Sequence, residues 1–329
     1  MQTDPAAILR IKNLKLYFPI GRKHGEPQYV KAVDDVSLDI AKGEIVGLVG
    51  ESGSGKSTLA YAVAGMFQPT GGSILYEGRE LGKKRGLDIK KSIQIVFQDP
   101  GSSLNPQHTI QQILELPLKI HQPQMTKQDR ERRVKELLNM VELPDSYRFK
   151  SPASIGGGEK QMAAIARALA TDPRLIILDE PTSALDVSIQ AKIINMLLKL
   201  QQQNHLTYLF ITHDLSLMRN IAGRVAILYL GKLDEVAPAE DFFRHPRHPY
   251  TQMLISSIPV ISDEEEALKP ARAESQGEIP SPVNLPPGCG FHQRCRQATG
   301  RCRSEDPVMR PVGEGHDVRC HLFDDGAGA

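Results

Sequence analysis

Residues 50–57 have the sequence GESGSGKS, between a short apolar run, EIVGLVG (44–50), and a helix-like segment, KSTLAYAVAGMF (56–67). The pattern G-x-x-x-x-G-K-S between a buried strand and a helix is typical of a phosphate-binding loop. Its glycines let backbone N–H groups turn inward around a phosphate, and the helix N-terminus adds partial positive charge. We therefore expect Lys56 to reach the β- and γ-phosphates and the Ser57 hydroxyl to hold Mg²⁺.

Further apolar runs on both sides of this loop predict the rest of a sheet. RLIILDE (174–180) and LTYLFITHD (206–214) lack polar alternation, which favours strands covered on both faces, and a helix-like segment follows each. The stretches 8–16 and 30–40 also have strand patterns. Strands that alternate with helices predict an α/β fold with a largely parallel sheet. The interval of about 100–170 is helical in pattern and predicts an inserted subdomain.

Two acidic residues end the predicted strand RLIILDE. Beside a phosphate-binding loop, Asp179 is expected to bind Mg²⁺, directly or through water, and Glu180 to polarise a water against the γ-phosphate. Without that loop, such a pair is more often a surface feature or a helix cap. His213 and Gln98 also follow apolar strand-like runs, but a lone histidine or glutamine there is more often structural.

Composition narrows the class of protein. Of 329 residues, 40 are Lys or Arg and 39 are Asp or Glu. This near balance argues against a chain that grips nucleic acid by its phosphates. No apolar run approaches the ~20 residues that span a bilayer, and the N-terminus lacks a signal-like segment. We expect a cytosolic protein whose membrane role, if any, comes through a partner.

The composition changes from Ser262. An acidic run (263–266) and the proline-rich EIPSPVNLPPG (278–288) predict a linker. All four cysteines follow it, and they are Cys289, Cys295, Cys302 and Cys320. In a reducing compartment four clustered thiols more often hold a metal than form disulfides. The spacing C-x5-C-x6-C-x17-C has no close pair, so zinc fits poorly, whereas four thiolates suit an iron–sulfur cluster. Unligated thiols are the alternative.

Taken together, these motifs resemble the ATP-binding subunits of ABC transporters. In chain order they are a Walker A motif (50–58), Gln98 of a Q-loop, a signature region (154–160), LIILDE as Walker B, SALD (183–186) as D-loop and the switch His213. The stretches QDPGSSLNP (98–106), HPYTQMLISSIP (248–259) and GEIPSPVNLPPGCGFHQRC (277–295) are similar to the oligopeptide/dipeptide importer branch. The resemblance covers nearly the whole chain.

The resemblance implies a fold and its domains. We expect a P-loop NTPase of the ABC type, with a parallel core sheet, an antiparallel β subdomain and the inserted helical subdomain at about 100–170. The ATPase domain would span 1–261. A linker and a small Cys-rich C-terminal domain would span 262–329, and in this branch such a domain resembles ones that carry a [4Fe–4S] centre.

The resemblance also implies a function. Two such subunits would sandwich ATP between the P-loop of one and the signature of the other, and their closure would drive two membrane permeases that receive substrate from an extracytoplasmic binding protein. The chain would lie on the cytoplasmic face of the plasma (inner) membrane. Substrate could be a peptide, nickel, a sugar or another small solute.

Residue roles follow from the same match. Phe18, or its neighbour Tyr17, would stack on adenine, and Asp186 would act across the dimer. Gln98 would sense Mg²⁺ and the γ-phosphate, which His213 would contact. The metal ligands would come from Ser57, Gln98 and Asp179. The residues around the phosphates would be Gly50, Glu51, Ser52, Gly53, Ser54, Gly55, Lys56, Ser57 and Thr58.

The signature departs from the family pattern L-S-G-G-Q, because the aligned residues here are Ile155, Gly156, Gly157, Gly158 and Glu159. Gly157 and Gly158 keep the backbone contact with the ATP of the opposite subunit. Gly156 lacks the serine hydroxyl, a hydrogen bond worth roughly 1.5–3 kcal/mol, and Glu159 brings negative charge. We expect two unequal ATP sites and therefore a heterodimer with a second ATPase. The alternative is that backbone N–H groups suffice and both sites work.

Two alternative functions would place the chain in other classes of protein. A DNA-repair or chromosome-structure ATPase of the same superfamily would need a coiled-coil insertion or a basic surface, and the sequence shows neither. A metal- or redox-sensing module that uses nucleotide only as a switch is disfavoured by the hydrolytic residues Glu180 and His213.

Overall fold

The computed structural model describes residues 7–23, 25–258 and 277–324. These residues form two compact units. The first comprises residues up to Ile40, then Ile45–Leu81 and the chain from Ile211 onward, and the second comprises Ala41–Glu44 and Gly82–Phe210. The boundary thus falls inside one strand, β8 (Thr207–Thr212). The acidic run at 263–266 lies outside the described residues.

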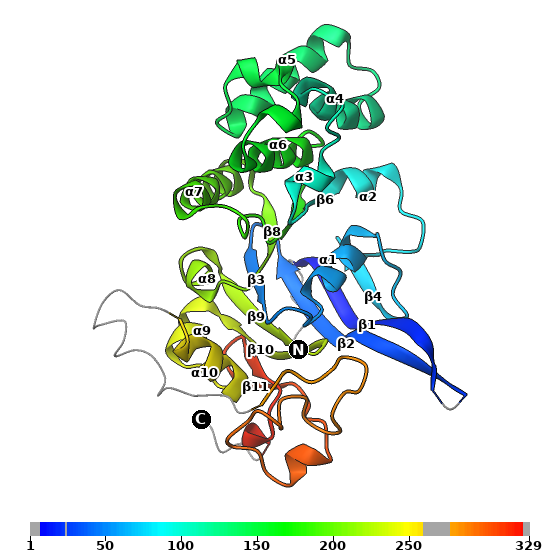
Figure 1. The fold of residues 1–329 in the computed structure, drawn as a ribbon, viewed down its shortest axis with the longest axis vertical. Helices are drawn as coiled ribbons and strands as arrows, with labels where there is room; N and C mark the ends of the chain where they lie inside the picture. Colours follow the sequence, from blue (N-terminus) through cyan, green and yellow to red (C-terminus); the bar gives the residue numbers. More distant parts are fainter. Residues whose placement is uncertain (1–6, 24, 259–276, 325–329) are drawn as a thin grey trace. The chain divides into compact units, whose positions relative to one another are not determined.

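An antiparallel sheet belongs to the first unit, with the strand order β2-β1-β4-β5. Its strands are β1 (Ala7–Lys23), β2 (Glu26–Ala41), β4 (Gly71–Tyr76) and β5 (Arg79–Glu80). Alternating apolar side chains of β1, among them Leu9, Ile11 and Leu14, are fully buried, as expected for a sheet with one covered face. Strands β1 and β4 pair antiparallel from Leu9 with Tyr76 onward. The expected antiparallel β subdomain is present (Figure 1).

The same unit holds a second row of strands in the order β11-β12-β10-β9-β3. The bounds are β3 (Ile45–Val49), β9 (Arg224–Tyr229), β10 (Lys232–Pro238), β11 (Arg310–Gly313) and β12 (His316–Val318). The helices of the unit are α1 (Lys56–Ala64), α8 (Leu215–Ile221), α9 (Ala239–Arg244) and α10 (Pro249–Ser256), with short 3₁₀ helices at Arg301–Arg303 and His321–Phe323. Strand β3 is buried along its whole length and pairs parallel with β9.

The C-terminal segment joins this sheet. Strand β12 pairs antiparallel with β10, placing Val318 opposite Glu235, and β11 pairs with β12. In Figure 1 the orange-to-red C-terminal chain lies beside β10. A segment this small cannot bury enough apolar surface to support a core of its own. The sequence did not predict that it would extend the sheet of the ATPase fold.

The second unit combines strands with helices. It contains β6 (Ile93–Val96), β7 (Leu175–Asp179) and most of β8, in the order β8-β7-β6, and β6 pairs parallel with β7. The helices are α2 (Leu87–Ser92), α3 (Pro100–Ser103), α4 (Ile110–His121), α5 (Lys127–Met140), α6 (Gly157–Leu169) and α7 (Val187–Asn204), with 3₁₀ turns at Asp145–Phe149 and Pro152–Ser154. Helices α4, α5 and α6 pack against one another (Figure 1).

The α/β fold with a parallel core, an antiparallel sheet and a helical insertion is therefore confirmed. The compact second unit is larger than the helical interval of about 100–170, because it also takes in β6, β7, β8 and α7. The predicted domain boundary at 261/262 lies among residues 259–276, outside the described part of the chain, and stays a prediction.

Candidate functional site

The phosphate-binding loop joins β3 to α1 in the first unit. Two of its glycines have no room for a side chain. A Cβ at Gly55, where φ is 104°, would stand 2.0 Å from the carbonyl oxygen of Ala32, and one at Gly50 would stand 2.1 Å from that of Leu228. The tight packing holds the loop against β2 and β9, with its backbone at the N-terminus of α1.

Lys56 is the first residue of α1, and only 5% of it is exposed. Its Nζ donates to the carbonyl oxygens of Gly50 at 2.7 Å and Glu51 at 3.0 Å. The ammonium therefore lies inside the curve of the loop, where a phosphate is expected. Ser57 follows on α1 and is half-buried.

In the second unit, β7 ends at Asp179, which is fully buried, and Glu180 follows. Glu180 has a φ of 45°, in the left-handed region. Gln98, after β6, donates from Nε2 to Oε2 of Glu180 at 3.1 Å. Parallel pairing of β6 with β7 puts the carboxyl ends of both strands at the same edge. The structure thus brings together two residues that the sequence nominated separately.

Other nominated residues belong to one unit or the other. His213 is exposed directly after β8 in the first unit. On β1, the Phe18 ring packs edge-on against Phe67 with centroids 5.4 Å apart, and Tyr17 donates its hydroxyl to Asp34. Burial, and then the hydrogen bond to Asp34, raise the pKa of Tyr17 above its usual value. The tyrosine hydroxyl is thus committed to Asp34.

The signature region forms the start of α6, in the second unit. Gly156 is the N-cap residue and supplies no side-chain hydrogen bond to the helix. The Glu159 carboxylate occupies the space where a Cβ of Gly156 would stand, because its Oε2 is 2.5 Å from that position. Gly158 is buried, and a Cβ there would lie 2.5 Å from Cγ2 of Ile189 on α7. The glycine at 158 therefore has a packing role besides any role in binding nucleotide.

Asp186 has a local structural function. It is the N-cap of α7, and Oδ1 accepts from the Ile189 N–H at 3.0 Å and from the Ser188 hydroxyl at 2.6 Å. These hydrogen bonds, that of Ser188 first, lower the pKa of Asp186 below its usual value. The side chain is exposed and ionised at neutral pH.

The three residues predicted to bind Mg²⁺ each offer an oxygen atom. These are the hydroxyl of Ser57 in the first unit, and the carboxylate of Asp179 and the amide oxygen of Gln98 in the second. Mg²⁺ prefers such oxygen ligands and usually keeps several waters, so it needs few protein groups. The donor chemistry therefore fits magnesium. Which of the three bind together stays a prediction.

The cysteine segment, which runs from Cys289 to Cys320, does not present a preformed metal-binding cluster. Among the residues that the structure describes, no three His, Cys, Asp or Glu side chains gather to hold a metal ion. Burial, followed by the charge of Asp234, raises the pKa of the Cys289 thiol to about 12. Burial also raises the pKa of Cys320 to about 12, with smaller effects of Cys295 and Cys302. Burial thus favours the protonated form of Cys289 and Cys320, and the expected metal site is not confirmed.

The sequence did not predict two contacts to the phosphate-binding loop. Arg294, from the cysteine segment, forms a bidentate ion pair with Glu51, at 2.7 and 3.0 Å. The Glu51 N–H donates to the Tyr250 hydroxyl at 3.2 Å. Tyr250 and Arg294 lie in the stretches 248–259 and 277–295 that resembled the importer branch, but the sequence of these stretches does not indicate which residues they contact.

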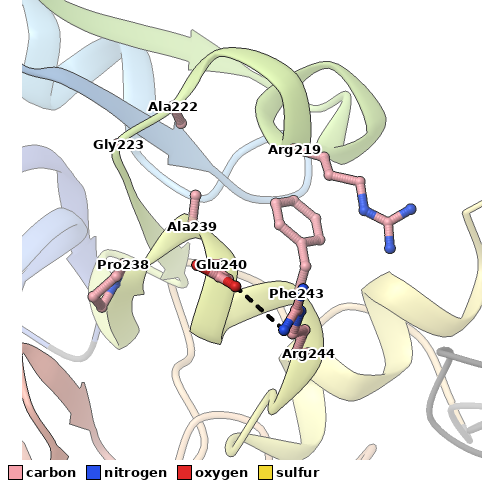
Figure 2. A pocket seen from close by; sticks show the side chains of 8 residues that line it. All are labelled: Arg219, Ala222, Gly223, Pro238, Ala239, Glu240, Phe243 and Arg244. Carbon is pink, nitrogen blue, oxygen red and sulfur yellow. Dashed lines mark ion pairs between the residues drawn. The ribbon is translucent and has the colours of Figure 1, made fainter.

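One open hollow lies at another place in the first unit, with a volume of about 690 Å³. Figure 2 shows its lining side chains, which come from α8, from the turn before β9, from the end of β10 and from α9. Glu240 and Arg244 form an ion pair at 3.2 Å, and the Arg219 guanidinium lies 5.6 Å from the Phe243 ring centroid. None of the nominated site residues lines this hollow.

Within the described ranges, every helix is too short or too polar to cross a lipid bilayer.

Comparison with known proteins gives two family matches. Residues 33–183 match the ABC transporter family, and residues 235–302 match the oligopeptide/dipeptide transporter C-terminal region. The oligopeptide transport ATP-binding protein AppF of Bacillus subtilis is 44% identical over 96% of this chain and 97% of its own length. The putative oligopeptide transport ATP-binding protein YkfD of the same organism is 43% identical over 96% of this chain and 95% of its own.

A solved structure is also similar. It is the ATP-binding cassette MJ0796 in a dimeric post-hydrolysis state bound to ADP and phosphate, with 31% identity and a TM-score of 0.63 over 70% of this chain and 98% of that one.

Proposed function

Because the chain belongs to the ABC transporter ATP-binding proteins of the oligopeptide/dipeptide branch, we propose that it hydrolyses ATP to power peptide import through a membrane permease. The observation that carries this proposal is the closed glycine loop around Lys56 at the N-terminus of α1, in a chain similar over nearly its whole length to oligopeptide transport ATP-binding proteins. A DNA-repair ATPase or a metal-sensing switch is not favoured, because that similarity includes the C-terminal region.

The loop binds the triphosphate. Its backbone N–H groups and the N-terminus of α1 surround the phosphates, and Lys56 exchanges the carbonyls of Gly50 and Glu51 for phosphate oxygens. In the proposed site, Phe18 or Tyr17 stacks on the adenine ring. The hydrogen bond that commits the Tyr17 hydroxyl to Asp34 supports Phe18 over Tyr17.

Hydrolysis uses the carboxylate of Glu180, which polarises the attacking water. Gln98 holds that carboxylate through its amide N–H, and so orients it. Ser57, Asp179 and Gln98 would hold Mg²⁺, which would supply positive charge against the triphosphate. His213 contacts the γ-phosphate, and Asp186 acts across the dimer in this proposal.

The assembly we propose contains this chain, a second ATPase chain and two permease subunits. The permeases receive peptide from an extracytoplasmic solute-binding protein and hold the ATPases at the cytoplasmic face of the inner membrane. The dimeric state of the similar cassette MJ0796 supports pairing of two cassettes. The altered signature supports a heterodimer, because two copies of this chain would place Gly156 and Glu159 in both ATP sites.

The four cysteines are proposed to hold a [4Fe–4S] cluster in the assembled protein. The number of cysteines in one short segment supports this, since iron–sulfur clusters are held by four thiolates. Binding would require the thiols to ionise. Anaerobic purification followed by iron and acid-labile sulfide analysis and visible absorbance tests it. A chain with zinc, or with neither metal nor sulfide, would contradict it.

Peptide uptake tests the main proposal. The chain is co-expressed with its second ATPase and permeases, reconstituted in vesicles with the solute-binding protein, and supplied with MgATP and a labelled oligopeptide. We expect uptake that requires ATP and this chain. Vesicles with the second ATPase alone are the control. ATP hydrolysis without uptake of any oligopeptide would contradict the peptide assignment, and absence of ATP binding would contradict the ATPase itself.

A further inference from the structure

Glu51, the second residue of the phosphate-binding loop, is held at three points. Its carboxylate accepts two hydrogen bonds from Arg294, its N–H donates to the Tyr250 hydroxyl, and its carbonyl accepts from Lys56. The first two partners belong to the chain beyond β10, and all of these residues lie in the first unit. The C-terminal part of the chain thus contacts the loop directly.

Arg294 is itself firmly placed. Its side chain is 7% exposed, and the guanidinium lies 5.7 Å from the Tyr229 ring centroid and 5.6 Å from that of Phe291. One guanidinium nitrogen also approaches the Tyr229 hydroxyl at 3.4 Å. A guanidinium is always positive in proteins, and these contacts leave Arg294 little freedom to move away from Glu51.

The Glu51 carboxylate carries a negative charge within a loop that is proposed to bind an anion. The loop is proposed to surround a triphosphate that carries several negative charges, and a bare carboxylate one residue after Gly50 would repel it. A bidentate guanidinium cancels that charge and fixes the carboxylate in one orientation. We infer that Arg294 is a positioning residue for the nucleotide site, which neutralises Glu51 and holds the loop in the shape that accepts triphosphate.

The inference rests on the proposed nucleotide function and extends it. It assigns the cysteine segment a role in the ATP site of the same chain, because Arg294 directly precedes Cys295. The segment then does more than extend the sheet through β12. It is a part of the structure on which ATP affinity depends.

Nucleotide titration of the full-length chain tests this. Binding of MgATP, MgADP and adenosine is measured by calorimetry for the native chain and for Arg294→Gln. We expect about tenfold weaker ATP binding in the variant, a smaller loss for ADP and little change for adenosine, since repulsion grows with phosphate charge. Arg303→Gln is the matched control, because Arg303 is exposed in the same segment and loses the same charge. It should bind ATP as the native chain does.

A double variant separates charge from shape. Arg294→Gln combined with Glu51→Gln removes both charges, and we expect it to bind ATP more tightly than Arg294→Gln alone. Should Arg294→Gln fail to fold, Arg294→Lys carries the test. It keeps the positive charge but loses the bidentate geometry, so we expect a loss of ATP affinity that is smaller than about tenfold but larger than the loss for adenosine.

Several results would overturn the inference. They are native ATP affinity in Arg294→Gln, a loss that is equal for ATP and adenosine in either Arg294 variant, or no recovery in the double variant. A native chain that binds no ATP would instead overturn the proposed function.

Discussion

Glu180 combines an unusual backbone conformation with a specific partner. Its φ of 45° lies in a region that costs a residue with a Cβ about 1–3 kcal/mol and that is concentrated at functional sites. Gln98 holds its carboxylate at 3.1 Å. Asp179, one residue earlier, is fully buried at the end of β7, whereas Glu180 is half-buried. The two adjacent acids thus have different surroundings. The buried Asp179 carboxylate is suited to binding a metal ion, and the more accessible Glu180 carboxylate is suited to contact a water molecule.

The first prediction concerns Glu180. Glu180→Gln keeps the side-chain size but removes the base, so we expect ATP hydrolysis by the assembled complex to fall roughly 100-fold or more, with ATP binding retained. Phosphate release and nucleotide titration measure the two effects. Glu136→Gln on the exposed face of α5 is the control and should change neither. Hydrolysis above a tenth of the native rate would count against Glu180 as the base.

At the scale of elements, the start of α6 lacks the side-chain cap that a helix of 13 residues usually has. Gly156 supplies no hydrogen bond, and Glu159 folds back over it. A serine at 156 would restore both a helix cap and a hydroxyl for phosphate. Its Cβ would meet only the end of the flexible Glu159 side chain, which is able to move.

The second prediction is therefore that Gly156→Ser with Glu159→Gln raises ATP hydrolysis by the complex roughly threefold or more, because a hydrogen bond to phosphate is gained and a negative charge removed. Gly156→Ala with Glu159→Gln is the matched control, which adds the Cβ without the hydroxyl and should gain less. Steady-state phosphate release is the measurement. An unchanged rate in the serine variant would show that backbone N–H groups suffice.

The third prediction concerns contact between α6 and α7. Gly158→Ala improves helix propensity, but its Cβ would lie 2.5 Å from Ile189 Cγ2, and we expect overpacking to destabilise the second unit by about 1–3 kcal/mol. Urea unfolding measures this. In an Ile189→Ala background the same change should cost much less, because the clashing methyl is gone. An equal cost in both backgrounds would exclude the clash as the cause.

For the whole molecule, buried polar side chains join the C-terminal segment to the first unit. His316 on β12 is 1% exposed, and its Nε2 lies 2.7 Å from Glu235 on β10, while Nδ1 contacts Asp241 on α9. Glu235 also accepts from the N–H groups of Arg247 and His248. Burial lowers the pKa of His316, but the hydrogen bonds with Glu235 and Asp241 outweigh it, and the net pKa is raised above the usual value.

The fourth prediction follows from that direction. Because the folded-state pKa of His316 exceeds its unfolded value of about 6.5, its ionised form stabilises the fold below that pH, and the contribution is lost as pH rises through the folded pKa. The difference in unfolding free energy between the native chain and His316→Gln should therefore shrink from pH 6 toward pH 9. Urea unfolding across that range measures it. His245→Gln, on the exposed side of Asp241, is the control. A difference independent of pH would contradict the shift.

Local patterns in the sequence predicted much of the fold. The apolar run before GESGSGKS, the run LIILD and the alternation of β1 each predicted a strand, because burial and period are properties of neighbouring residues. Asp179, Glu180, Gln98 and Lys56 were nominated from motifs that likewise lie in short segments. The helix from Lys56 ends at Ala64, earlier than the pattern at 56–67 suggested, because Gly65 adopts a left-handed conformation.

What the sequence determined by itself is the phosphate-binding loop, the strand ends that carry the acids and the membership of a transporter family. Tertiary structure alone decided the pairing of Arg294 with Glu51, the joining of β12 to β10 and the position of Glu159 over Gly156. These contacts link residues far apart in the chain or depend on side-chain direction. Contacts that depend on complementary charge and shape produce no periodic pattern in the sequence, so only the folded chain shows these contacts.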